Sequence, residues 1–96
     1  MNDSTKIGSK QFIELCTKTL CEYYNSRQEL RQGAAGILEP KETYVVWYAK
    51  TLQNHKCLMS TTAADGMYFE FTYNGDNNEL YLDAYRKWEN KKYTVQ

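Results

Sequence analysis

The chain has 96 residues, with 12 basic and 12 acidic side chains and therefore no formal net charge. That length suits one small domain with little room for a deep cleft, and the charge balance argues against a strongly basic nucleic-acid binder. Residues 1–10 lack the apolar core of a signal peptide, and the chain has no apolar run of the roughly 18 residues that a membrane span requires. The sequence therefore predicts a cytoplasmic protein that makes no membrane contact.

An amphipathic helix is predicted over residues 10–32, after a frayed start at 1–9 in which Ser9 is the N-cap. Its apolar residues recur at steps of three and four, the period of one helical face: Phe12, Ile13, Cys16, Leu20, Tyr23, Tyr24 and Leu30. The helix is expected to end near Gly33, in the small-residue stretch 33–36. Pro40 then favours an extended entry to the next element.

The remainder is rich in β-branched and aromatic residues, which favours an antiparallel sheet over residues 43–88. Turns are expected at Asn54-His55 and at 74–77, and residues 86–96 are compatible with either a strand or a helix. The predicted strands are 43–52, 56–62, 67–73 and 79–85. The fold class is therefore α+β: one domain over 1–96, with an N-terminal helix packed on a four-stranded antiparallel meander.

The last two predicted strands can be paired by their alternation. If Tyr73 lies opposite Asn78, then Phe71, Phe69 and Met67 lie opposite Leu80, Leu82 and Ala84, and all six share one apolar face. The first predicted strand differs, because both of its faces carry apolar residues. Such a strand is normally covered on both sides, and one helix covers one side only. We expect the second face to be covered by a terminus, covered by a partner, or open.

Candidate metal and nucleophile sites are weak. Cys16, Cys21, His55 and Cys57 have the donor atoms that zinc prefers, but Cys16 and Cys21 would point about 140° apart on a helix. His55 and Cys57 would share a strand face and resemble a thiolate–imidazole pair, but His55 falls in a predicted turn, where a solvated side chain is the ordinary case. The three free cysteines suit a reducing compartment.

Two further chemistries are disfavoured. Glu70, Glu79 and Asp83 share the polar face of the last hairpin, where carboxylates are ordinarily solvated. The GxxG of 33–36 lacks the following Lys-Ser or Lys-Thr of a phosphate loop. We therefore predict neither an enzyme nor a bound cofactor or metal.

The strongest candidate site is a tyrosine-rich surface of the sheet. Tyrosine is favoured at interfaces because it combines a large apolar ring with a polar tip. The candidate residues are Tyr44, Tyr48, Lys50, Tyr68, Glu70, Tyr81, Asp83 and Tyr85. Acidic residues within this set disfavour phosphate, so we expect a protein partner, with self-association as a related means of covering the face. The alternative is nucleic-acid or nucleotide binding by the same tyrosines with Lys50, Arg86 and Lys87.

Three segments carry a family resemblance: YVVWYAKTLQNHK, LMSTTAADGMYFEFTYNGD and ELYLDAYRKWEN. They resemble a family of short uncharacterised proteins from bacteriophages and prophages of Gram-positive bacteria, strongly over residues 44–93 and weakly over the helix. The resemblance implies a small phage accessory protein made inside the host cell. Such proteins often bind a host factor, including components of antiviral defence, so it predicts a host protein as the partner.

Overall fold

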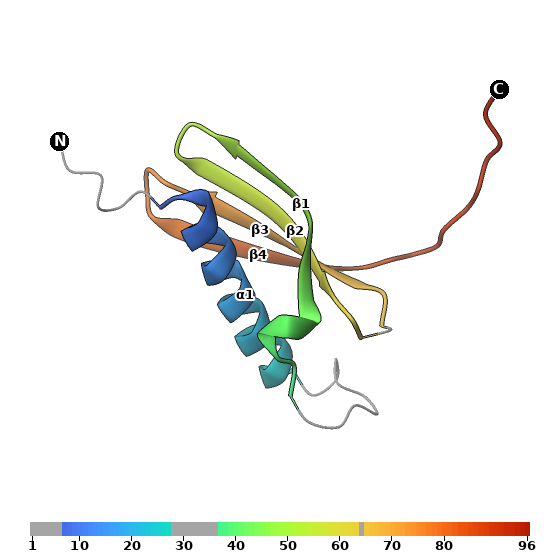
Figure 1. Cartoon of the computed structure of the whole chain (residues 1–96), viewed down its shortest axis with the longest axis horizontal. Coiled ribbons are helices and arrows are strands. Elements are labelled where there is room, and N and C mark those ends of the chain that lie inside the picture. The colour runs from blue at the N-terminus through green and yellow to red at the C-terminus, as the bar shows by residue number, and fades with distance from the viewer. Residues whose placement is uncertain (1–6, 28–36, 64) are drawn as a thin grey trace.

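The computed structural model describes residues 7–27, 37–63 and 65–96 (Figure 1). Along the chain lie the helix α1 (Ser9–Ser26), the short 3₁₀ helix η2 (Pro40–Glu42) and the strands β1 (Thr43–Thr51), β2 (Asn54–Thr61), β3 (Met67–Asn74) and β4 (Glu79–Arg86). The strands form one antiparallel sheet in the order β1-β2-β3-β4, and α1 lies against one side of it. This confirms the predicted α+β fold.

The core lies between α1 and the face of the sheet that α1 covers, here called the helix face. A ridge at four-residue spacing is buried along α1: Phe12, Cys16, Leu20 and Tyr24. Alternate residues of β2 and β3 pack against it: Cys57, Met59, Met67, Phe69, Phe71 and Tyr73. Burying each large side chain contributes about 1.5–3 kcal/mol, so this two-layer contact is the main source of stability. The opposite side of the sheet is called the outer face.

Both ends of α1 differ from the prediction. The N-cap is Gly8 rather than Ser9, and its N–H donates to the side chain of Gln11. The helix ends at Ser26, short of the predicted residue 32; the expected terminator Gly33 lies outside the described residues. The hydroxyl of Tyr24 already reaches Asp65, in the connection before β3, at 2.6 Å.

The first hairpin turn also differs from the prediction. Thr51 pairs with Asn54, so the turn consists of Leu52 and Gln53, and His55 belongs to β2. The predicted turn at Asn54-His55 was therefore wrong. Asn54 is instead the first residue of β2, and its side-chain oxygen accepts a hydrogen bond from the N–H of Gly75 in the β3–β4 turn.

The pairing of β3 with β4 is shifted by two residues from the predicted register. Tyr73 lies opposite Leu80, not Asn78, and Phe71 lies opposite Leu82. The cause is Asn74, which is the last residue of β3. Its side-chain oxygen accepts hydrogen bonds from the N–H groups of Asp76 and Asn77 in the turn that follows. Because the shift is even, every side chain keeps its predicted face.

A β-bulge interrupts β1. Val45 pairs with Met59 and Trp47 pairs with Leu58, which leaves Val46 as the extra residue. Beyond the bulge the alternation is reversed. Tyr48 therefore lies on the helix face and Trp47 on the outer face.

Residues 87–96, here called the arm, contain neither helix nor strand. The arm begins where Lys87 N–H donates to the carbonyl of Gly66, and it then runs away from the sheet (Figure 1). The sheet itself therefore ends at Arg86, two residues before the predicted 88. Among the described residues, no helix combines the length and the apolar character needed to cross a membrane.

Candidate functional site

The outer face is built by alternate side chains from all four strands. Its register places Trp47 beside Leu58 and Tyr68 beside Tyr85. The large apolar and aromatic residues of this face are Tyr44, Trp47, Leu58, Tyr68, Tyr81 and Tyr85. No described helix or strand packs over them, because α1 lies on the other side (Figure 1). An exposed aromatic surface of this kind is typical of an interaction site.

A charged band crosses the middle of the outer face. Lys56 Nζ lies 3.2 Å from Glu70, and the Tyr85 hydroxyl donates to the same carboxylate at 3.2 Å. Asp83 lies directly opposite Glu70 on β4. Two like charges opposite one another are unfavourable, and Lys56 offsets part of that repulsion.

Two tyrosine hydroxyls of the outer face are held by carboxylates. Tyr81 donates to Glu79 at 2.7 Å, as Tyr85 does to Glu70. Each hydrogen bond to a carboxylate raises the pKa of the tyrosine, so both phenols stay protonated near neutral pH. The rings are thus fixed in place while their faces remain exposed.

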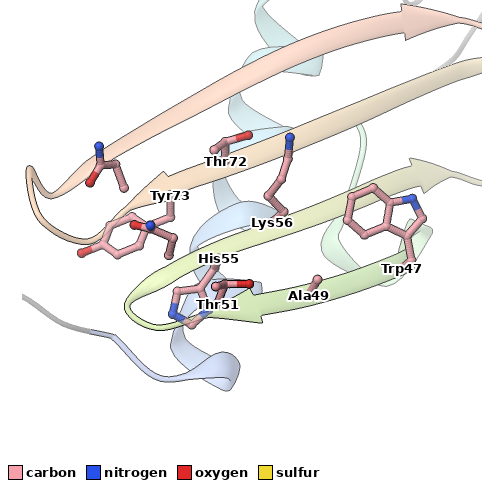
Figure 2. A pocket seen from close by; sticks show the side chains of 9 residues that line it. Trp47, Ala49, Thr51, His55, Lys56, Thr72 and Tyr73 are labelled. Atoms are coloured by element: carbon pink, nitrogen blue, oxygen red, sulfur yellow. The ribbon is translucent and has the colours of Figure 1, made fainter.

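An open groove of about 480 Å³ lies on the outer face near the two hairpin turns (Figure 2). Its outer-face lining residues are Trp47, Ala49, Thr51, Asn54, Lys56, Thr72 and Asn74. The Trp47 ring stands at one end, with small side chains along β1 and the Lys56 amine across from them. Such a groove can accept an apolar side chain flanked by hydrogen-bonding groups.

Six of the eight predicted surface residues share the outer face: Tyr44, Tyr68, Glu70, Tyr81, Asp83 and Tyr85. The placement of Tyr48 and Lys50 with them was wrong, because the bulge at Val46 turns both toward the helix face. The same bulge brings Trp47 to the outer face, which the pattern of β1 did not indicate. Lys56 could have been found from the alternation of the predicted strand 56–62, in which it shares a face with Leu58.

His55 is 1% exposed and both of its ring nitrogens are bonded. Nδ1 lies 2.8 Å from the Tyr48 hydroxyl, and Nε2 lies 3.0 Å from the carbonyl of Ile7. The ring also stacks on Phe12 at 4.8 Å between centroids. The expectation of a solvated turn histidine was wrong. This histidine instead joins the N-terminus of α1 to two strands.

Two of the three cysteines also lie in the core, and Cys21 is half-buried beside it. Cys16 and Cys57 are both fully buried, one on α1 and one on β2. The hydrogen bond between their thiols, together with burial, raises the pKa of Cys16. Among the described residues, no three His, Cys, Asp or Glu side chains are grouped closely enough to hold a metal ion.

One helix, a four-stranded meander and an uncovered aromatic face define a small α+β protein with an open-faced sheet. The chain belongs to a family of unknown function, DUF6275, whose profile matches residues 13–95. No curated protein and no solved structure matches it. The match spans the helix as well as the sheet, so the expected membership of an uncharacterised family is confirmed. The phage origin and the Gram-positive host remain predictions.

Proposed function

We propose that the chain is a non-enzymatic binding protein that holds another protein against the outer face of its sheet. The observation that carries the proposal is the set of exposed aromatic residues on a face that α1 does not cover. Aromatic side chains are the usual anchors of protein interfaces, since their burial is favourable and they lose little conformational entropy.

The partner in this proposal is a host protein inside a bacterial cell, such as a component of antiviral defence. The resemblance to small phage proteins supports this choice, and the mixed character of the face agrees with it. Glu70 and Asp83 of the charged band lie among the aromatic residues, so the face offers a protein partner apolar rings together with hydrogen-bond acceptors.

The alternative is nucleic-acid or nucleotide binding, and the placement of the cations gives it less support. Lys50 lies opposite His55 and Arg86 opposite Met67, so both extend from the helix-face positions of their strands. Arg86 also donates to the carbonyl of Asp65 at 2.8 Å. The outer face therefore combines its tyrosines mainly with carboxylates, which repel phosphate.

Affinity capture from bacterial cells with matched variants tests the proposal. Trp47→Ala and Tyr81→Ala each remove an outer-face ring, and Ile37→Ala removes an exposed apolar side chain outside the sheet. A specific foreign protein should be retained by the native chain and by Ile37→Ala, and be lost with the other two variants. Equal retention by all variants would contradict the proposal. Capture of nucleic acid that is released steeply by moderate salt would favour the alternative.

A further inference from the structure

The arm exposes large side chains that its own chain does not bury. Trp88 is 93% exposed, Tyr93 is 75% exposed and Val95 is 87% exposed. All ten residues of the arm are exposed, and it leaves the sheet instead of folding back over either face (Figure 1). An extended segment that carries tryptophan and tyrosine gains stability only by packing on another surface.

The arm and the outer face carry opposite charge. The side chains of the arm carry a net charge of +2, from Lys87, Lys91, Lys92 and Glu89. The side chains of the outer face carry a net charge of −2, from Glu70, Glu79, Asp83 and Lys56. Each therefore offers the other aromatic surface together with complementary charge.

Within one chain the two do not meet, since the arm departs from the end of β4 in the direction away from the sheet. A second copy removes this restriction. In a twofold dimer each arm can lie over the outer face of the partner copy, so the symmetry creates two identical arm-to-face contacts. Two such contacts bury twice the surface of one. A single short segment alone buries less surface than a stable interface requires.

We infer that the protein forms a dimer by arm exchange, in which residues 87–96 of one copy bind the outer face of the second. Trp88 and Tyr93 pack on the aromatic residues of that face, and Lys91 and Lys92 approach its carboxylates. The inference rests on the proposed function, because it names an occupant for the same protein-binding face. A foreign protein then competes with the arm for that face.

The test is the oligomeric state of the full chain, measured by sedimentation across a concentration series. The native chain should sediment as a dimer of the 11.3 kDa protein. Trp88→Ser with Tyr93→Ser should raise the dimer dissociation constant about tenfold or more, because buried aromatic anchors dominate such interfaces. The helix variant Lys18→Glu, which changes an exposed charge away from both surfaces, should leave it unchanged.

A charge exchange identifies the two contacting surfaces. Asp83→Lys on the face should weaken the dimer, and so should Lys91→Glu with Lys92→Glu in the arm. Mixing the two variants should restore association through the one matched arm and face. A monomer at every concentration, or a dimer insensitive to the arm substitutions, would overturn arm exchange. Neither result would bear on the proposed function, which depends on capture of a foreign protein by the outer face.

Discussion

The Tyr48 hydroxyl on β1 donates a hydrogen bond to Nδ1 of His55 on β2, across 2.8 Å. The direction follows from the other ring nitrogen, since Nε2 faces the carbonyl of Ile7 and must carry the proton. Ser9 then donates to the Tyr48 oxygen at 2.7 Å. The neutral imidazole thus connects the start of α1 to the edge strand β1.

Replacing Tyr48 with phenylalanine should destabilise the protein although the ring is kept. The substitution leaves Nδ1 of buried His55 without its donor, at a cost of about 1–3 kcal/mol. Tyr44→Phe, which removes an exposed hydroxyl on the same strand, should change the free energy of unfolding by no more than about 0.5 kcal/mol. Urea denaturation of both variants measures the difference, and equal effects would show that the Tyr48–His55 bond contributes nothing.

Stability should fall with acidification between pH 7 and pH 5. Burial lowers the pKa of His55 from its ordinary 6.5, so the unfolded chain takes up a proton before the folded protein does. The stability associated with neutral His55 is present above pH 6.5 and is lost as the pH falls toward the lower folded pKa. One proton limits the slope to about 1.4 kcal/mol per pH unit. His55→Gln should flatten the profile of unfolding free energy in this window. A profile that is unchanged by this substitution would assign the pH dependence to other groups.

Much of the fold follows from side-chain periodicity. The four-residue spacing of Phe12, Cys16 and Leu20 defines the buried side of α1, and the alternation from Met67 to Tyr73 defines the helix face of β3. These signals are strong because burial acts on every repeat in the same direction. The faces of β3 and β4 were therefore predicted correctly even though their register was shifted by two residues.

The parts that were mispredicted depend on single residues in special geometry. One extra residue, Val46, reverses the alternation of β1 beyond the bulge. Trp47 therefore lies on the outer face, where Tyr48 was predicted. A strand with apolar residues on both sides gives no sign of where such a bulge lies. The first turn was misplaced because Asn54 resembles a turn residue, whereas the residue in the left-handed conformation is Leu52.

Gly75→Ala should destabilise the contact between the two hairpin turns. A methyl group at residue 75 would lie 2.3 Å from the backbone oxygen of Gln53, an atom that cannot move without shifting the turn. Overpacking of this kind costs about 1–3 kcal/mol. Gly8→Ala is the matched control, because its methyl would meet only the flexible end of Gln11 at 3.7 Å. Its expected cost, measured by the same urea denaturation, is below about 1 kcal/mol. An equal loss of unfolding free energy in the two variants would show that the turns move apart to accept the methyl group without cost.

Leu52→Asn should stabilise the protein. Leu52 has φ 57° at the first position of the two-residue turn, and a left-handed conformation costs a branched side chain about 1–2 kcal/mol. Asparagine tolerates this conformation, and little packing is lost because Leu52 is 79% exposed. We expect the free energy of unfolding to rise by about 0.5–1 kcal/mol, measured by thermal or urea denaturation. Leu52→Ala removes the same side chain without relieving the backbone, so it should give no gain. A gain of equal size for alanine would show that exposure of the leucine, and not its backbone conformation, is the unfavourable feature.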